Sequence, residues 1–520
     1  MYNPPFFVFT EEEIMSAMLK IFSILCCVIF VSCGGGAPEE NNEIPDENVP
    51  AEDYDPSDTD TAAEKTGEET DKDGDTALSD EDSVENDGDT TDDDGDFEEL
   101  QTGGIYIFSD FDESGNAKSR NILGNGGFLG FSIFSLGEKY WAVSAIHESI
   151  PAFDWDKATG RLYIFEKGKR VESLDDSAFV LNHPDKSLNV GFGYTAAAPC
   201  DINGDGFDDL AVSSHLASSG DLYAAGEFVI FYGSSNGWNE ETYSISRLSA
   251  EYIQKADSMS QSLACLDYDG DGFADIFAGG QNAGPDLPGG GSQGMVAFFK
   301  GSASGLSENE SRVMLPEVEE KAQYFGSSML VDDLNGDDLP DLVVAGWGLK
   351  KNESSANSGG VYIYLGGTDW QMQASTKIFG TADSQFGSAV KVIETGGKKY
   401  LAVLASKEEK YGTVRFYDPA ENFAEAGVFS FPPTFNAEDG SISDFDTIKI
   451  SADTDLFVAG GKNFGSGGSI YCSTVKNKTV SSPETCRFRP ESPAGGFGNS
   501  VFNNKNGEIV VGMPEYIHKF

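Results

Sequence analysis

Three short segments of the chain place carboxylate or carboxamide side chains at nearly every second position and then become apolar. They read CDINGDGFDDLAV from residue 200, CLDYDGDGFADIFA from residue 265 and VDDLNGDDLPDLVVA from residue 331. Counted from the first residue of each acidic series, positions 1, 3, 5 and 9 offer side-chain oxygens and position 7 offers a backbone carbonyl. Calcium prefers roughly six to eight oxygens at about 2.3–2.6 Å. The spacing therefore predicts three calcium sites, with about three Ca²⁺ ions as cofactors.

The predicted ligands form three sets, each completed by the carbonyl of the residue at position 7. They are Asp201, Asn203, Asp205, Phe207 and Asp209; Asp267, Asp269, Asp271, Phe273 and Asp275; and Asp333, Asn335, Asp337, Leu339 and Asp341. The third loop is the least regular, because Asp338 stands at position 6 in place of glycine. Acidic turns that hold no metal and only keep the surface soluble are the alternative interpretation.

These loops do not match an EF-hand, which needs a bidentate Glu at position 12 and flanking helices. Position 12 is occupied by Val212, Ala278 and Val344. The segments that follow the loops (LAVSS, IFAGG and LVVAG) are short, apolar and glycine- or serine-ended, which is typical of strands. Each loop is therefore predicted to join two strands.

Two further motifs recur through the second part of the chain, as expected for a repeat architecture. A strand of the form glycine followed by apolar and aromatic residues begins near residues 104, 160, 226, 294, 360, 412 and 468. An aromatic or apolar residue followed by glycine begins LGFS at 129, FGYT at 192, FGSS at 325, FGSA at 386 and FGNS at 497. Degenerate versions of this second motif are MSQS at 259 and DGSI at 439.

These units resemble FG-GAP repeats, the blades of the seven-bladed β-propeller of integrin alpha subunits. The resemblance covers about residues 102–520 and implies an all-β propeller whose inner hairpins carry calcium in acidic loops. Three other hairpins, SLGEKYWAV, ETGGKKYLAV and NNKNGEIVV, keep the turn but lack the carboxylates. They are predicted to close without metal.

The two ends of the repeat region complement each other. The region begins with an unpaired strand, TGGIYIFSD, and its last unit stops after two strands. A propeller must protect its sheet edges, so the N-terminal strands are predicted to complete the last blade. The expected fold is a seven-bladed β-propeller over residues 101–520.

The N-terminus predicts an export signal over residues 1–32, with Met18 as the expected start. Lys20 precedes the apolar run IFSILCCVIFVS, which is too short to span a bilayer. The residues before Cys33 resemble a bacterial lipobox, with Phe30 at a position where the family carries Leu. This predicts a lipid-anchored protein of the outer membrane, cell surface or periplasm; an ordinary signal peptide is the alternative.

Residues 33–100 are predicted to form an anchor and a disordered acidic linker. Within them, residues 39–100 hold 28 Asp or Glu against two Lys, and the formal net charge of the chain is −53. Such a tract cannot bury enough apolar surface to fold. Residues 101–520 hold 56 acids against 31 bases, which argues against nucleic-acid binding.

The remaining cysteines permit disulfides, because an exported chain meets an oxidising environment. Cys472 and Cys486 are predicted to form a bridge across a polar loop. Cys200 and Cys265 each lie just before an acidic loop, and they either pair across neighbouring repeats or act as small buried apolar residues.

The predicted function is a monomeric binding, adhesion or protein-interaction module with a protein or glycan ligand. Loops on rigid scaffolds commonly carry recognition, and three long connections, Ala217–Ala225, Gln281–Gln293 and Leu349–Ser358, are candidates. The four His residues are scattered and no HExxH motif occurs. A polysaccharide lyase or hydrolase and an envelope-assembly scaffold are the alternatives.

Overall fold

We describe a computed structural model of the chain. It describes residues 103–112, 116–124, 127–148, 159–185, 190–219, 222–249, 252, 258–285, 287, 292–366, 372–431, 440–451, 454–461, 468–476, 479–480, 486–488 and 496–514. The predicted signal peptide, Cys33 and the acidic linker lie outside these residues. Residues Glu99–Phe520 form one compact unit.

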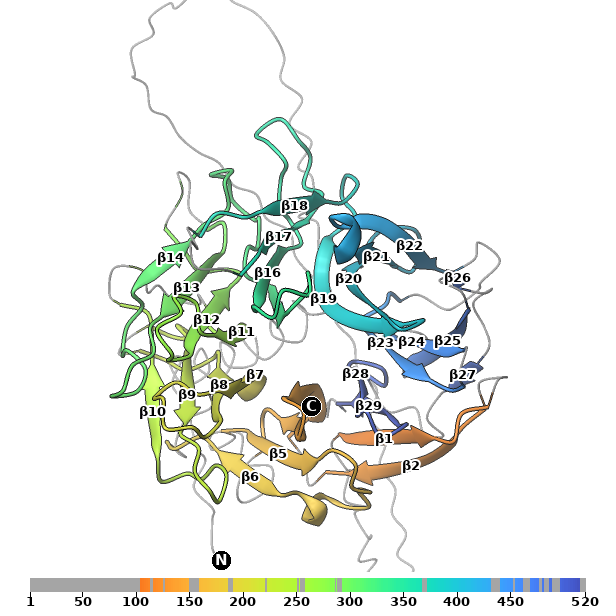
Figure 1. Ribbon diagram of the computed structural model, residues 1–520, viewed down its shortest axis with the longest axis horizontal. Coiled ribbons are helices and arrows are strands. Elements are labelled where there is room, and N and C mark those ends of the chain that lie inside the picture. Colours follow the sequence, from red (N-terminus) through yellow and green to blue (C-terminus); the bar gives the residue numbers. More distant parts are fainter. Residues whose placement is uncertain are drawn as a thin grey trace, which may run out of the picture. The chain divides into compact units, whose positions relative to one another are not determined.

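Antiparallel strands form seven sheets arranged around a central axis (Figure 1). We number the blades from the first complete one. Blade 1 has β3 (Leu129–Leu136), β4 (Tyr140–Ala145), β5 (Arg161–Glu166) and β6 (Phe179–Asn182); blade 2 has β7 (Phe192–Cys200), β8 (Asp209–Ser214), β9 (Glu227–Phe231) and β10 (Tyr243–Ser246); blade 3 has β11 (Ser262–Leu266), β12 (Asp275–Gly280), β13 (Met295–Phe299) and β14 (Arg312–Met314).

The remaining four blades follow the same order. Blade 4 has β15 (Ser328–Asp332), β16 (Asp341–Gly346), β17 (Gly360–Tyr364) and β18 (Thr376–Phe379); blade 5 has β19 (Phe386–Thr395), β20 (Lys398–Ala405), β21 (Thr413–Asp418) and β22 (Ala424–Ser430); blade 6 has β23 (Asp444–Lys449), β24 (Asp455–Gly461), β25 (Ser469–Lys476), β26 (Thr479–Val480) and β27 (Cys486–Phe488); blade 7 has β28 (Val501–Asn503), β29 (Ile509–Met513), β1 (Gly104–Ser109) and β2 (Lys118–Leu123).

Helix within the described ranges is limited to two 3₁₀ turns, Leu174–Asp176 and Pro419–Glu421. No described helix is long and apolar enough to cross a membrane. The prediction of an all-β chain is confirmed.

The second strand of each blade is mostly or wholly buried because sheets pack on both of its faces. All six residues of β8, β12 and β16 are buried, and so are all seven of β24. Strands covered on both faces carry nearly continuous apolar runs instead of alternating ones. This burial explains the unbroken LAV, IFA and LVVA runs that follow the acidic loops.

The ring is closed by pairing the two ends of the repeat region, as predicted. Strand β1 pairs antiparallel with β29, from Gly104 opposite Met513 to Phe108 opposite Ile509. Blade 7 also contacts blade 1, where the side-chain amide of Asn499 donates to the Phe131 carbonyl at 2.6 Å. The seven-bladed prediction with a shared last blade is therefore confirmed.

The two recurring sequence motifs are the two sides of one contact between blades. The glycine that precedes the third strand of one blade forms a parallel bridge with the aromatic or apolar residue that starts the next blade, as Gly294 does with Phe325. A Cβ on Gly294, whose φ is +83°, would lie 2.3 Å from the Phe325 nitrogen. The motif residues Leu129, Phe192, Met259, Phe325, Phe386, Ile442 and Phe497 are all at most 2% exposed.

One degenerate motif was predicted correctly and the other was misplaced. Met259 occupies the aromatic position, and Ser260 takes the positive φ of the usual glycine, +70°. In blade 6, however, Ile442 occupies that position, three residues beyond the predicted Asp439, and its amide donates to the Tyr411 carbonyl at 2.9 Å. The position is buried between blades, which selects an apolar side chain over an acidic one.

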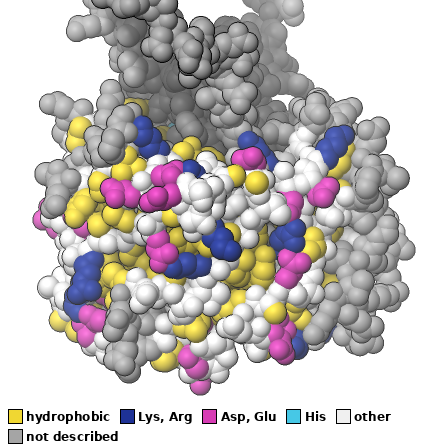
Figure 2. Space-filling model, turned by 90° about the horizontal axis from the view of Figure 1, so that it is seen from above, with side chains coloured by type: hydrophobic (Ala, Val, Ile, Leu, Met, Phe, Trp, Pro, Cys, Tyr) yellow, Lys and Arg dark blue, Asp and Glu magenta, His cyan; other side chains and the backbone are white. Residues whose placement is uncertain are grey.

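Acidic and basic side chains are interspersed among apolar ones over the described part of the side that Figure 2 shows. Ion pairs also join neighbouring blades. Lys391 lies 2.7 Å from Asp444, and Lys399 lies 2.6 Å from Asp332. These ion pairs are partly exposed, so each contributes modestly to stability.

Candidate metal centre

The three acidic loops lie at the same end of three consecutive blades. Each joins the first strand of its blade to the second: β7 to β8, β11 to β12 and β15 to β16. The prediction that each loop connects two strands is confirmed, and an EF-hand is excluded.

The Asp at position 1 organises the bend of each loop. In the first loop, the amides of Asp205 and Gly206 each donate to a different oxygen of Asp201, both at 3.0 Å. Asp267 and Asp333 accept the same pair of bonds in the other two loops. Asp338 adopts a left-handed φ of +65°, which Asp tolerates better than most residues, so the third loop keeps the same path.

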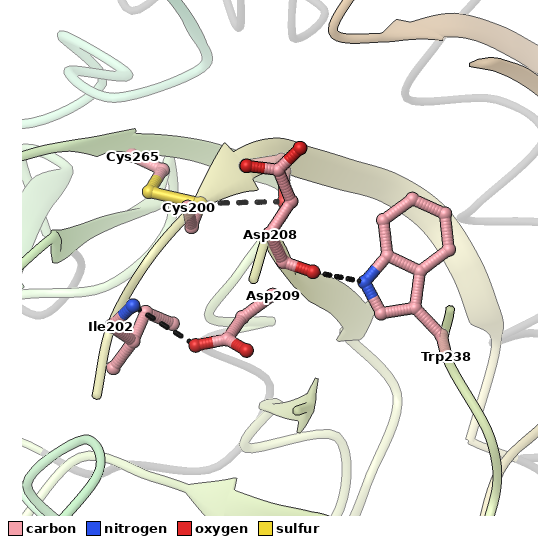
Figure 3. The surroundings of a disulfide bond; sticks show 7 residues. Cys200, Ile202, Asp208, Asp209, Trp238 and Cys265 are labelled. Atoms are coloured by element: carbon pink, nitrogen blue, oxygen red, sulfur yellow. Dashed lines mark hydrogen bonds between the residues drawn. A yellow bond between two sulfur atoms is a disulfide. The ribbon is translucent and has the colours of Figure 1, made fainter. Parts of the chain in front are cut away.

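The Asp at position 9 is the first residue of the second strand and is fully buried in all three loops: Asp209, Asp275 and Asp341 are each 0% exposed. One carboxylate oxygen accepts from the amide at position 2, and the other from a glycine amide after the third strand. For Asp209 one donor is Ile202 at 2.9 Å (Figure 3). The other donor is Gly233 at 2.7 Å. The Asp therefore ties the loop to the sheet.

Burial raises the pKa of Asp209 and of Asp275 to about 6 against the stabilising effect of these hydrogen bonds. The neighbouring acids contribute to both raised pKa values: Asp205 and Asp201 act on Asp209, and Asp269 acts on Asp275. Burial also raises the pKa of Asp341. A bound cation would offset the cost of holding these groups ionised.

The carboxylates converge in the second loop. One oxygen from each of Asp267, Asp269 and Asp275 lies within 4.8 Å of the other two. The amino group of Lys300, just after β13, contacts Asp269 and lies 2.9 Å from Asp271. A positive charge thus pairs with two of the predicted ligands, and the all-oxygen donor set has the chemistry of a calcium site.

Lys300 has no charged equivalent in the other two loops. The residues that precede the corresponding glycines Gly233 and Gly366 are Tyr232 and Leu365. The sequence analysis did not find Lys300, because it lies 25 residues beyond Asp275. Its only signal is its place directly before the glycine whose amide binds Asp275.

The structure places all the predicted ligands in these three loops, but calcium occupancy stays a prediction. Positions 3 and 5 contact each other in the first and third loops, where Asn203 donates to Asp205 at 3.0 Å and Asn335 donates to Asp337 at 2.9 Å. The side chains of Phe207 and Leu339, at position 7, are about two-fifths exposed, at 41% and 42%. Position 7 can contribute only its carbonyl.

Blade 6 contains a related carboxylate that the sequence analysis missed. Asp455 begins β24 just as Asp209 begins β8, and it accepts from the Thr395 hydroxyl at 2.7 Å and the Gly396 amide at 2.9 Å. These donors belong to the hairpin of blade 5. A neighbouring blade therefore supplies hydrogen bonds to this Asp, and its signal was the segment DLFVAGG, which is similar to DLAVSS.

Cys200 and Cys265 form a disulfide between blades 2 and 3, with their Cα atoms 6.0 Å apart (Figure 3). This decides between the two alternatives for these cysteines. Cys472 is also disulfide-bonded, and the register of β25 and β27 places Cys486 opposite it. The side chain of Cys486 lies outside the described residues, so the predicted bridge between this pair stays a prediction.

The three long connections lie at the other end of the blades, since they join the second strands to the third. One of them, Gln281–Gln293, is contacted by Trp347, which lies two residues before the connection Leu349–Ser358. The Trp347 indole donates to the Gln281 side chain at 3.1 Å and stacks on Tyr324 with ring centroids 3.5 Å apart.

The closed ring, the interblade FG contacts and the acidic inner hairpins define a β-propeller of the FG-GAP type. The FG-GAP repeat model matches residues 192–231, in blade 2, and 325–364, in blade 4. The described ring is an integrin alpha-like FG-GAP propeller.

Comparison with curated proteins supports this class. The chain is 26% identical to integrin alpha-4 of Xenopus laevis over 251 residues, which are 47% of this chain and 22% of that protein. It is 28% identical to integrin alpha-V of Gallus gallus over 35% of this chain and 17% of that protein. It is 26% identical to the phosphatidylinositol-glycan-specific phospholipase D of Bos taurus over 32% of this chain and 20% of that protein. The matches thus span about a fifth of these relatives.

Proposed function

We propose that this protein is an exported, monomeric calcium-binding module that recognises a protein or glycan ligand from a membrane-anchored position. The observation that carries the calcium part is the second loop, where oxygens of Asp267, Asp269 and Asp275 converge within 4.8 Å of one another. Asp201, Asp267 and Asp333 would start the three ligand sets, and the buried Asp at position 9 would complete each. Calcium supplies a positive charge that these carboxylates share.

The expected role of calcium is to hold each inner hairpin to its sheet. Positions 1, 3 and 5 belong to the hairpin loop, whereas position 9 belongs to the buried second strand. An ion shared by these positions restrains the loop relative to the strand. Binding to the folded state alone also stabilises that state by mass action.

The calcium proposal is tested by metal analysis of the full chain against a matched variant. The control carries Asp201→Asn, Asp267→Asn and Asp333→Asn, which preserve shape and leave the acidic N-terminal region unchanged. We expect about three more equivalents of calcium in the parent than in the control after dialysis at millimolar calcium, since extracellular modules bind at about 10⁻⁴–10⁻³ M. A difference of one or none contradicts the proposal.

The recognition surface proposed here is the end of the ring opposite the metal loops. The contact of Trp347 with Gln281 and Tyr324 supports it, because half-buried aromatic groups held by their neighbours are typical of binding surfaces. The test is a pull-down from envelope and culture material with and without calcium. A Trp347→Ala variant is expected to lose specific partners while it retains its calcium.

The membrane part of the proposal assigns residues 1–32 to a signal, Cys33 to a lipid anchor and residues 33–100 to a solvated spacer. A Cys33→Ser variant should be released from membranes and partition into the aqueous phase of a detergent separation. Retention of the variant in the detergent phase would place the anchor elsewhere.

The enzyme alternative requires convergent acid and base groups that are open to a substrate. In two of the buried clusters of titratable groups among the described residues, the acidic and basic members bind one another. Arg161 lies 2.8 Å from Glu148, which also contacts Tyr163, and Glu227 contacts His183 and Arg247. These pairs lie in and beside the strands of blades 1 and 2, and neither cluster supports the enzyme alternative, because its acids and bases are occupied by each other.

A further inference from the structure

We propose that the first and second acidic loops bind calcium cooperatively, as one coupled pair, while the third loop binds independently. This inference rests on the calcium-binding function proposed above and states how calcium at one site changes the calcium affinity of the other. Three separate contacts join the first loop to the second. None of the three has a counterpart between the second loop and the third within the described residues.

The first contact is covalent. Cys200 directly precedes Asp201, the first ligand of its loop, and Cys265 lies two residues before Asp267. The disulfide therefore fixes the starts of both loops relative to each other. The corresponding positions between the second and third loops are Leu266 and Val331, which cannot form such a bond.

The second contact is a backbone hydrogen bond between the loops. The amide of Ala274, at position 8 of the second loop, donates to the carbonyl of Asp201 at 2.8 Å. Ala274 directly precedes the ligand residue Asp275. A movement of Asp275 and Ala274 is therefore transmitted to Asp201, a ligand residue of the first loop. Position 8 of the third loop is Pro340, which has no N–H group and cannot donate to Asp267.

The third contact is a close packing of ring against backbone. A Cβ on Gly204, at position 4 of the first loop, would lie 2.7 Å from the ring of Phe273 in the second loop. The ring fills the space that a side chain would occupy. By contrast, a Cβ on Gly270, at position 4 of the second loop, would meet no described atom within 4 Å.

Because of these contacts, a restraint on the conformation of one loop also restrains the other. When calcium restrains the second loop, Phe273 and Ala274 become fixed, and both touch the first loop. The ion that binds the first loop then meets a loop that has already lost part of its conformational freedom. Its binding costs less conformational entropy, which gives positive cooperativity. Because such coupling is reciprocal, each ion should strengthen binding of the other by the same factor, about 5–150-fold for typical coupled sites.

The experiment compares calcium isotherms of full-length variants by calorimetry, with Asp→Asn at position 1 to disable single loops. The variant Asp333→Asn leaves the first and second loops; adding Asp267→Asn or Asp201→Asn isolates one of them. The coupling factor is the constant for binding two ions to the variant with both loops, divided by the product of the binding constants of the two single-loop variants. For the second and third loops, Asp201→Asn is the background variant. Adding Asp267→Asn or Asp333→Asn to it then isolates one of these two loops.

We expect a coupling factor of at least about 5 for the first pair of loops and about 1 for the second pair. Ala274→Pro, which copies the third loop, should lower the first factor toward 1, and so should Cys200→Ser combined with Cys265→Ser. Pro340→Ala is the control and should leave the first factor unchanged. Thermal unfolding of each variant in chelator shows whether it still folds.

A factor near 1 for the first pair overturns the inference, and so does an equal factor for both pairs. A first-pair factor that survives Ala274→Pro and the double Ser variant also overturns it, because the named contacts would not carry it. Identical isotherms for the parent and the variant with all three loops disabled have a different meaning. They refute calcium binding itself, and the coupling with it.

Discussion

Lys300 is a charged residue whose position changes what its loop can bind. Its amino group contacts Asp269 and Asp271, which lowers the pKa of Asp271 and raises that of Lys300. The other two loops carry Tyr232 and Leu365 at this position. The second loop must therefore displace an internal cation before calcium binds, so its affinity is expected to be the weakest of the three.

We predict that Lys300→Met increases the calcium affinity of the second loop by about fivefold or more. Two positive charges about 4 Å apart repel each other by about 1 kcal/mol even in water, and the ion carries two charges. The measurement is a calcium titration in the Asp201→Asn, Asp333→Asn background. Lys377→Met, which removes a surface lysine paired with Glu317, is the control and should change nothing. An unchanged affinity in the Lys300 variant contradicts the prediction.

His215 is a buried residue that should make stability depend on pH. Burial lowers the pKa of His215 to about 3, and the charge of His147 lowers it further, while a hydrogen bond with the Gly191 backbone opposes the shift. The ring packs on Tyr194, with centroids 4.2 Å apart. Because the unfolded chain binds the proton more tightly, stability is complete above about pH 6.5 and falls between about pH 6.5 and 3.

The expected result is that a His215→Gln variant loses less stability than the parent as the pH falls from 7 to 4. The measurement is the midpoint of denaturant unfolding across that range in chelator. Comparing the two proteins cancels the opposite effect of the buried Asp residues, whose raised pKa values favour folding at low pH. Parallel curves for the two proteins would be inconsistent with a lowered pKa of His215.

At the scale of elements, several blades are joined to the next through the glycine that precedes the third strand. Gly294 meets Phe325 there, and Gly359 and Gly468 meet Phe386 and Phe497 in the same way. Glycine is required at these positions for two reasons. Its φ is positive, and the backbone of the next blade leaves no room for a Cβ. The strand motif and the FG motif are therefore selected together.

We predict that Gly294→Ala lowers the free energy of unfolding by at least about 3 kcal/mol. A left-handed Ala costs about 1–2 kcal/mol, and its Cβ would also clash with the Phe325 backbone. Gly168→Ala is the matched control, because Gly168 has a similar φ of +79° with no described atom near its Cβ. Denaturant unfolding measures both variants. If both lose the same stability, the interblade contact contributes nothing.

At the scale of the whole molecule, one noncovalent seam closes the ring. It consists of the pairing of β1 with β29 and the packing of Ile105 and Ile107 among buried residues of blades 1 and 7. Losing this seam exposes unpaired strand edges, which promote aggregation. The closure therefore stabilises more than the contacts that it contains.

Deletion of residues 101–123 is expected to abolish most cooperative unfolding or to cause aggregation, whereas deletion of residues 39–98 should leave the unfolding midpoint nearly unchanged. The first change removes β1 and β2, and the second removes only residues outside the compact unit Glu99–Phe520. Calorimetry and light scattering would distinguish the two variants. A 101–123 deletion that unfolds like the parent would mean that the ring does not depend on its shared blade.

The sequence by itself determined the features that arise from local pattern. The runs after Cys200, Cys265 and Val331 predicted strand, loop and strand, and the unpaired segment at residue 104 predicted the shared blade. These predictions succeeded because strand burial and turn chemistry are written in neighbouring residues, and because counting strands in a closed ring requires no distances. The fold class and the location of the acidic loops were therefore accessible.

Only the tertiary structure decided which residues meet across blades. It paired Cys200 with Cys265, placed Lys300 at the second loop, gave Ile442 the position expected for Asp439, and connected Asp455 to the hairpin of blade 5. Most of these partners lie about one repeat apart in the chain or on different strands. Periodicity reports which face of a strand is buried, but it carries no information about the neighbour that covers that face. That neighbour is set by how the blades pack around the ring.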